Sequence, residues 1–338
     1  MNELSRALFT SIVPIFVLVM MGYAIRRLGA VGSRGTDGLS KIVLLILFPI
    51  LVFHRLAVTD DAQTMLTDWP ILVWPFVVLI GSGLIGWLWH RVNRLRADLR
   101  TFVFLVGMPN WIYIPLALAG PIWGDEAVRL IILFNIPTQL LLWTVGIWLL
   151  KGDLRGVHAL RYLCTSPGLL AAVGGVLVAF QVIPISFSPD HPGFSLARLN
   201  PVLHVLGGLT IPLSLFALGL YVGERAETPG EVFVNVIWVG IGRLIIAPLA
   251  MIFLVVGLAK LGYGANPMIR WVVYLIATMP VAVSVPLFAA MFGRDRFLAS
   301  RSVVVTTMVG FLTAPLLVLF ALKLETWLGI HKGRISEF

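Results

Sequence analysis

Charged residues are scarce in this chain of 338 residues. Asp, Glu, Lys and Arg make up only 12% of it, whereas soluble domains carry roughly 25%. Hydrophobic residues make up 59%, and the mean hydropathy is +0.97. A chain this apolar cannot cover its surface with polar groups. The composition therefore excludes a soluble protein and predicts an all-α integral membrane protein in contact with the lipid bilayer.

Features that mark many enzymes and metal proteins are also missing. The single cysteine, Cys164, excludes a disulfide framework within one chain. His, Cys, Asp and Glu form no cluster with the spacing of metal ligands, so we expect no metal and no other cofactor. No G-x-S-x-G, H-E-x-x-H or Walker A sequence occurs. The chain is therefore expected not to be an enzyme.

Two glycine-rich stretches have a structural interpretation. "GSGLIG" at 81–86 fits the dinucleotide-binding pattern, but it lies in an apolar run and not between a strand and a helix. Small residues inside membrane helices permit close helix contact. We expect that role for 81–86 and also for "GLYVG" at 219–223.

Long apolar runs dominate what remains. A membrane span needs about 20 mostly apolar residues, and the chain contains ten such runs, at residues 8–27, 38–57, 70–90, 101–122, 128–150, 166–184, 200–223, 234–258, 267–292 and 301–323. All sixteen acidic residues lie outside these runs or at their ends, and among the basic residues only Arg243 lies well inside one. We therefore expect ten transmembrane helices.

The distribution of the basic residues predicts the orientation. The links that follow odd-numbered spans carry fifteen Lys and Arg residues, against nine on the other side. The positive-inside rule places the first set of links in the cytoplasm and both termini outside it. The net acidic link "ERAETPGE" does not follow this trend. Because the net charge of +9 is spread over loops, we expect a multi-pass membrane protein and no nucleic-acid partner.

Two pairs of similar stretches reveal an internal repeat. "GMPNWIYIPL" at 107–116 and "TMPVAVSVPL" at 278–287 share Met-Pro, five residues and Pro-Leu. "LFPILVF" around Pro49 similarly resembles "TIPLSLF" around Pro212. Spans 2 and 4 thus match spans 7 and 9, which predicts two five-helix units, at 1–150 and 151–338. Because five is odd, the second unit is inverted relative to the first.

The paired prolines indicate that spans 4 and 9 are broken. Pro109, Pro115, Pro280 and Pro286 each remove a backbone donor and clash with the preceding turn. Non-helical backbone at membrane depth is tolerated only where it is buried in protein or lines a watery cavity. Transporters with inverted repeats use such breaks to form a substrate site near the midplane. The repeated break predicts such a site, and ordinary proline kinks are the alternative.

Polar residues are concentrated around these breaks. The first break and the following span supply six polar candidates, and the second break supplies one: Asn110, Trp111, Tyr113, Asn135, Thr138, Gln139 and Ser284. Together with the four prolines, these residues form the predicted substrate site. Each could instead serve as a hydrogen bond between helices. Because the first break carries more polar residues, we expect it to determine substrate selectivity.

Arg243 has two possible roles. An ionised side chain inside the membrane is costly and marks a functional hypothesis. Arg243 could offset the charge of an anionic substrate, or it could bind backbone carbonyls freed by the broken helices. Pro49 and Pro212 are expected to be structural.

The missing carboxylates limit the mechanism. Proton relays in pumps and transporters use intramembrane Asp and Glu residues, and the span interiors contain none. Facilitated transport down a gradient remains, as does a cation site made of backbone carbonyls and hydroxyls. A membrane receptor that binds a ligand without moving it is the alternative from another class.

An ordered set of motifs resembles the auxin efflux carrier family. The motifs are "LFPILVFHRLA" in span 2, "MPNWIYIPL" in span 4, "TQLLLWT" in span 5, "GRLIIAP" in span 8 and "MPVAVSVPL" in span 9. The likeness runs from about residue 8 to 322 and includes bacterial-type members. It covers nearly the whole chain.

The resemblance implies a fold related to the bile-acid/sodium symporters and to NhaA. It implies a scaffold of spans 1, 2, 6 and 7 and a transport domain of spans 3–5 and 8–10, with elevator-type movement and a homodimer. Family members export or exchange organic anions such as auxin, malonate or malate. Asn110, Gln139 and the four crossover prolines would then belong to the binding site. A sodium-coupled symporter of the bile-acid type is the alternative within this class.

Overall fold

The structure is a computed structural model that describes residues 3–58, 66–152, 165–187, 194–224, 230–263 and 266–330. Nearly all of these residues are helical, and the two strands in this part of the chain, β1 (Ile185–Ser186) and β2 (Phe194–Ser195), form one short parallel pair. Cys164 and most of the acidic stretch at 59–68 lie outside the described residues, as do the outermost residues at both termini.

The first half of the chain forms helices in the following order: α1 (Glu3–Arg27), α2 (Ser33–Ile42), η1 (Val43–Leu47), α3 (Phe48–Ala57), η2 (Trp69–Leu72), η3 (Phe76–Ile80), α5 (Gly81–Val92), α6 (Leu99–Gly107), α7 (Tyr113–Leu141), η4 (Leu142–Gly146) and α8 (Ile147–Lys151). Gly124 has φ of 73° inside α7, which divides that helix at a turn. A positive φ is open to glycine at no steric cost.

The second half continues with α10 (Pro167–Ala179), η5 (Ala197–Leu199), α11 (Asn200–Gly208), α12 (Thr210–Val222), α13 (Gly230–Ile241), η6 (Gly242–Ile246), α14 (Ala247–Lys260), α15 (Pro267–Ala277), α16 (Val285–Met291) and α17 (Arg296–Trp327). The helix expected over 166–184 ends at Ala179, and Gln181 adopts a φ of 56°. The last helix continues beyond the expected end at 323.

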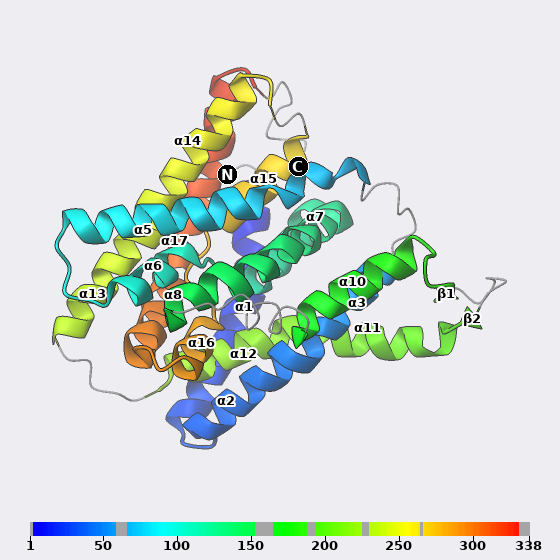
Figure 1. Ribbon diagram of the computed structural model, residues 1–338, viewed down its shortest axis with the longest axis horizontal. Coiled ribbons are helices and arrows are strands. Elements are labelled where there is room, and N and C mark those ends of the chain that lie inside the picture. The colour runs from blue at the N-terminus through cyan, green and yellow to red at the C-terminus, as the bar shows by residue number, and fades with distance from the viewer. Residues whose placement is uncertain are drawn as a thin grey trace.

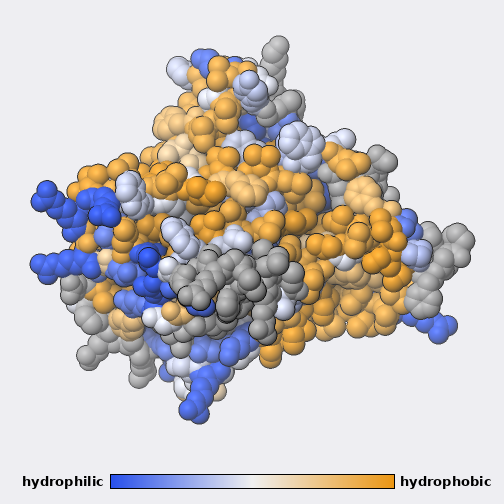
Figure 2. Space-filling model, in the orientation of Figure 1, coloured by the Kyte–Doolittle hydropathy of each residue, from blue (hydrophilic) through white to orange (hydrophobic). Residues whose placement is uncertain are grey.

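The helices are those of a multi-pass membrane protein. In the described residues, six helical segments are long and apolar enough to cross a membrane, at 33–57, 69–92, 113–151, 197–222, 232–260 and 297–327. Figure 2 shows a broad hydrophobic surface, with hydrophilic side chains gathered mainly at its edges. The helical membrane class is confirmed, whereas ten spans in two inverted repeats remain a prediction.

Four of the helices contain a π-helical turn. These turns are η1, η3, η4 and η6, and each continues directly into an α-helix. An i→i+5 turn is rare and frequently lies at a functional site. Here η1 and η4 flank the site described below, and Arg243 lies in η6.

One group of helices packs around α1 and α3. In this group α1 contacts α12, α3 contacts α10 and α11, and α2 contacts α12. Figure 1 shows α3, α10 and α11 side by side at one end of the molecule. A Cβ on Gly219 would lie 2.0 Å from the carbonyl oxygen of Val19, and one on Gly22 would lie 2.1 Å from that of Phe216. The close helix contact expected at 219–223 is therefore confirmed.

A second group contains α5, α6, α8 and the helices from α13 to α17. Here α5 contacts α6 and α14, and α17 contacts α13, α15 and α16. A Cβ on Gly86 would lie 2.8 Å from Val106 Cβ, and one on Gly81 would lie 2.9 Å from Met251 Cε. The glycines of 81–86 thus serve helix packing, as the sequence indicated. The long helix α7 contacts both groups.

Asp98 caps the start of α6. Its carboxylate accepts hydrogen bonds from the backbone N–H and the hydroxyl of Thr101, at 2.9 and 2.7 Å. Partial burial alone would raise the pKa of Asp98, but these bonds and the nearby Arg294 and Arg100 outweigh it and lower the pKa below 3.8. The cap fixes where α6 begins, and therefore where it meets the first break.

Candidate functional site

The two proline-containing breaks lie against each other. Helix α6 ends at Gly107 and α7 begins at Tyr113, while α15 ends at Ala277 and α16 begins at Val285. Between them Pro109 pairs with Val281 in an isolated antiparallel bridge. The N–H of Asn110 donates to the Pro280 carbonyl at 2.7 Å, and the N–H of Ala282 donates to the Met108 carbonyl at 3.0 Å. Each break therefore satisfies backbone groups of the other.

Side chains hold the ends of the breaks. Asn110 Oδ1 accepts from the N–H of Tyr113 at 3.2 Å and so caps the start of α7. On the other side, the N–H of Val281 donates to the hydroxyl of Thr306 on α17 at 3.2 Å. A Cβ on Gly310 would lie 3.3 Å from Pro280, so the glycine admits α17 close to the second break. Hydrogen bonds and close packing thus stabilise both breaks.

Arg243 reaches both helix ends from η6. Its side chain is fully buried and donates to the carbonyl of Val106 at 2.9 Å and to the carbonyl of Ala277. In an unbroken helix these carbonyls would accept from the N–H groups of residues 110 and 281. Those two N–H groups bind Pro280 and Thr306 instead. The guanidinium thus replaces two missing helical donors, which corresponds to the second of the roles that the sequence left open.

A chain of hydrogen bonds connects the first break to α7. Trp111 Nε1 donates to Asn135 Oδ1 at 3.0 Å, and Gln139 Nε2 donates to the same oxygen at 3.1 Å. Trp143 Nε1 then donates to Gln139 Oε1 at 3.3 Å. Thr138 instead donates to the Phe134 carbonyl of its own helix at 2.8 Å. The network fixes the Trp111 indole and holds Gln139 between Asn135 and Trp143.

Two small cavities lie beside the breaks. The first has a volume of about 30 Å³, and residues of the breaks, of α7 and η4, of η1 and α3, and of the start of α10 line it. The second, of about 20 Å³, reaches α2 and α12. Leu44, Tyr113 and Ser284 line both. Each has room for about one water molecule. A ligand much larger than water therefore requires the surrounding helices to move apart.

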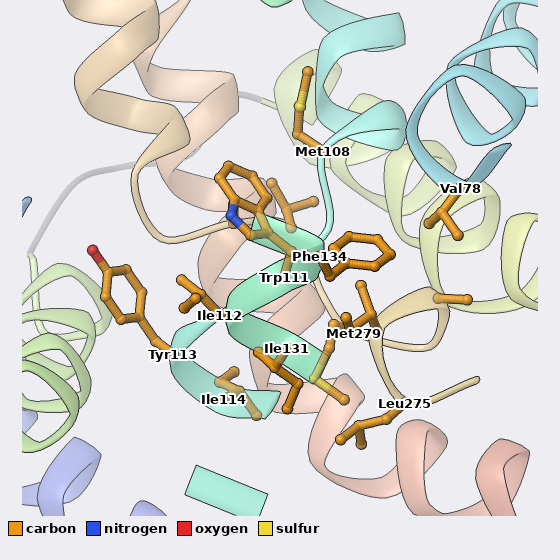
Figure 3. Packing of buried hydrophobic residues seen from close by; sticks show 14 of the residues in the cluster. Val78, Met108, Trp111, Ile112, Tyr113, Ile114, Ile131, Phe134, Leu275 and Met279 are labelled. Carbon is orange, nitrogen blue, oxygen red and sulfur yellow. The ribbon is translucent and has the colours of Figure 1, made fainter. Parts of the chain in front are cut away.

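Four of the predicted site residues line the first cavity: Trp111, Tyr113, Gln139 and Ser284. Figure 3 shows Tyr113 directed away from the Val78 side of the cluster. Tyr113 is only 7% exposed, and its ring meets Phe48 edge-on at 5.9 Å. Within the described ranges, neither the Tyr113 hydroxyl nor the Ser284 hydroxyl has a hydrogen-bond partner in the protein. Both are available to a ligand at the junction of the cavities.

The remaining predicted residues support the site from behind. Seven do not line either cavity: Pro109, Asn110, Pro115, Asn135, Thr138, Pro280 and Pro286. Asn110 and Asn135 are fully or almost fully buried, and the Nδ2 group of each has no partner in the described part of the chain. Pro49 and Pro212 also lie outside the cavities, although Phe48, next to Pro49, lines the first.

Sequence reasoning missed several lining residues. Ser166 and Trp143 line the first cavity, and Ser40 and Ser214 line the second. Ser166 is the N-cap of α10, where it accepts from the N–H of Leu169 at 3.4 Å. The Ser-Pro pair at 166–167 is a recognisable helix-start signal. No local pattern links Ser40 or Ser214 to the breaks.

A buried ion pair at the far end of α15 was also missed. Arg270 Nε donates to Glu325 at 2.5 Å and Arg270 Nη2 at 3.2 Å, while the Tyr274 hydroxyl donates to Glu325 at 2.8 Å. Glu325 is 1% exposed. The sequence did not predict this burial, because Glu325 lies beyond the expected last span. The pair joins α15 to α17, away from the cavities.

A comparison with known protein families gives a match that covers nearly the whole chain. The profile of the family described as membrane transport protein matches residues 7–163 and 159–318. The chain belongs to this family. This confirms the resemblance to the auxin efflux carriers seen in the sequence motifs, and it shows that the chain is a membrane transporter.

Relatives in the membrane transport protein family come from archaea and bacteria. An uncharacterized transporter of Methanothermobacter thermautotrophicus is 24% identical over 313 residues, which covers 90% of this chain and 96% of the relative. An uncharacterized transporter of Methanocaldococcus jannaschii is 24% identical over 310 residues, with 89% and 95% covered. The uncharacterized transporter YfdV of Escherichia coli K12 is 21% identical over 317 residues, with 90% and 95% covered.

Proposed function

We propose that this transporter carries a small organic anion, such as a malonate-, malate- or auxin-like carboxylate, at the meeting point of the two breaks. The observation that carries the proposal is the pair of bonded breaks beside a cavity lined by Tyr113, Gln139 and Ser284. Two hydroxyls and an amide can donate hydrogen bonds to a carboxylate. The proposal places these donors on the substrate.

An anion fits the electrostatics better than a cation does. Neither cavity is lined by Asp or Glu in the described residues. Helix α7 begins at Tyr113 on the cavity wall, and the start of a helix carries positive potential. Arg243 adds a positive charge behind the breaks, on the Val106 and Ala277 carbonyls. A carboxylate would lie in a field of the right sign.

Ten spans in two inverted repeats, with broken crossover helices 4 and 9, are the fold that we propose. The support is the similar break in each half and a further pairing of π-turns. The turn η3 precedes α5 in the third expected span, and η6 precedes α14 in the eighth. Spans 3 and 8 correspond in two five-helix units. The proposed topology places both termini outside the cytoplasm of a bacterial inner membrane.

The position of the cavity supports elevator-type movement. One wall comes from η1, α3 and the start of α10, and the other from the breaks, α7 and η4. The first wall belongs to the proposed scaffold of spans 1, 2, 6 and 7, which would also form a homodimer. The second belongs to the proposed transport domain of spans 3–5 and 8–10. Sliding one wall past the other would open a cavity that now holds only about one water.

The direct test is counterflow of radiolabelled carboxylates in proteoliposomes. Tyr113→Phe and Ser284→Ala each remove one hydroxyl and little volume, and we expect the apparent affinity to fall about tenfold for each. Tyr263→Phe, at a residue 68% exposed outside the site, is the matched control. Unchanged affinity in both site variants, for every anion transported, would refute the site.

Coupling and transport itself have separate tests. Flux that is unaffected when potassium replaces sodium at matched voltage would exclude a sodium-coupled symporter of the bile-acid type. Saturable binding without any counterflow would instead support the non-transporting receptor. Counterflow that requires sodium would instead support the symporter, with the cation held by backbone carbonyls and hydroxyls.

A further inference from the structure

A large apolar groove lies on the outer side of α6, behind the first break. Its volume is about 500 Å³, which lies within the range of about 300–1,000 Å³ of ligand pockets. Three walls form it: η3 and α5, helix α6, and the segment from the end of α7 through η4 to α8. It is separate from the two cavities at the proposed substrate site, since no residue lines both.

The chemistry of the groove is almost uniform. The residues that line it are apolar, with the single exception of Arg100. Several of them are well exposed, including Leu84 at 61%, Trp87 at 46% and Trp148 at 50%. In a membrane protein such a surface faces hydrocarbon. An open apolar groove of this size is therefore suited to an alkyl chain.

The length of the groove matches one leaflet of a bilayer. Along α6 it extends from Leu99 and Arg100 to Gly107 and Met108. Eight residues of helix cover about 12 Å, and half of the hydrocarbon core is about 15 Å. With Arg100 at the headgroup level, Met108 would lie near the middle of the membrane.

Charge complementarity identifies the headgroup. Arg100 closes "RVNRLRADLR" at 91–100, which carries four arginines and one aspartate. The Arg100 guanidinium reaches across to the end of α8, where a Cβ on Gly152 would lie 2.0 Å from Nη1. Asp98 already binds Thr101 and Arg294. Within the described residues, the Arg100 guanidinium makes no hydrogen bond to the protein and remains available to a phosphate.

We propose that this groove is a binding site for an anionic phospholipid, with one acyl chain between α5, α6 and α8 and the phosphate on Arg100. The end of the acyl chain would lie against Met108, whose carbonyl accepts the bond from Ala282 in the second break. A bound lipid therefore contacts the break from the side opposite the cavities. The site depends on the membrane location of the chain and not on which substrate is carried.

Photocrosslinking tests the position of the lipid. The full chain in nanodiscs would receive phosphatidylglycerol or phosphatidylcholine with a diazirine near the end of one acyl chain, followed by peptide mapping. We expect phosphatidylglycerol to label the groove segments more strongly than the exposed face of α17. Val145→Trp and, independently, Leu84→Trp fill the groove and should reduce this labelling severalfold. Leu312→Trp, at a residue 68% exposed on α17, is the matched control.

Headgroup selectivity tests the role of Arg100. A basic residue near an anionic lipid surface contributes about fivefold in affinity, so Arg100→Gln should lower the preference for phosphatidylglycerol over phosphatidylcholine by about that factor. Arg100→Lys should retain it, and Arg94→Gln, at an exposed arginine of the same stretch that does not line the groove, should leave it unchanged. Equal labelling by both lipids in the unmodified protein would overturn the proposal. So would groove labelling that neither tryptophan variant reduces, or a second copy of the chain crosslinked across the groove.

Discussion

Replacing Arg243 by methionine would remove the group that connects the two broken helices. The guanidinium donates to the carbonyls at the ends of α6 and α15, Val106 and Ala277. Neither carbonyl has a helical donor, because the N–H groups four residues later bind elsewhere. Methionine fills similar space but supplies no donor. The variant would leave two carbonyls unpaired beside the breaks.

The expected loss is large. Hydrogen bonds to charged groups contribute about 1.5–3 kcal/mol each in substitution experiments, so two of them contribute about 3–6 kcal/mol. Methionine also removes the cost of burying the charge, which offsets part of this loss. Arg243→Lys keeps the charge but concentrates it on one ammonium group. We expect lysine to satisfy one carbonyl and to lose about half of that energy.

Reversible unfolding in mixed micelles of sodium dodecyl sulfate would measure the free energies. Leu244→Met is the matched control, because Leu244 is 2% exposed in the same π-turn and makes no side-chain hydrogen bond. A volume-conserving change of this kind usually costs less than about 1.5 kcal/mol. If Arg243→Met were no more destabilising than this control, the role assigned to the guanidinium would be wrong.

Three further predictions concern stability in the same assay. Glu325→Gln should lower the free energy of unfolding by about 3–5 kcal/mol because it leaves Arg270 charged and buried. A double variant with apolar residues at both positions should lower it by less. Equal losses in the single and double variants would contradict this. Gly219→Ala places a Cβ 2.0 Å from a carbonyl oxygen of α1 and should destabilise strongly, whereas Gly257→Ala, in open space, should stabilise by about 0.5–1 kcal/mol. Asp98→Ala should cost about 0.5–2 kcal/mol as a lost cap. Folding lowers the pKa of Asp98. The stability that Asp98 contributes is therefore present above its unfolded pKa and is lost as the pH falls through its folded pKa. The stability of Asp98→Ala should accordingly be less sensitive to acid.

The sequence predicts the features that depend on backbone chemistry. Proline lacks an N–H, so Pro109 and Pro280 identify both breaks from the order of the residues alone. A buried arginine with no acidic residue in the neighbouring spans needs neutral acceptors, and free carbonyls at the breaks are the nearest. The glycines at 81–86 and 219–223 similarly indicate close helix contacts. Each of these inferences follows from a residue that permits few alternatives.

The direction in which a side chain points could not be predicted in the same way. Asn110 and Asn135 are polar and close to the break in sequence, yet both turn into the protein and hold Tyr113 and Trp111. A polar residue in an apolar run must find a partner, and the sequence does not show whether that partner is protein or ligand. Glu325 illustrates the opposite error. It lies beyond the expected last span and was not expected to be buried, yet it forms a buried ion pair.

The lining of the cavities gives both breaks a place in the proposed site. By sequence the first break is the more polar, but of its polar residues only Trp111 and Tyr113 reach the cavity. Asn110 instead accepts from the Tyr113 backbone N–H, and Asn135 accepts from the Trp111 indole. The second break supplies Ser284, which lies at the junction of both cavities opposite Tyr113. One hydroxyl thus comes from each half of the chain. If both bind one carboxylate, Tyr113→Phe and Ser284→Ala act on the same interaction, so their effects on transport affinity should be non-additive. Strict additivity would mean that the two breaks contact different parts of the substrate.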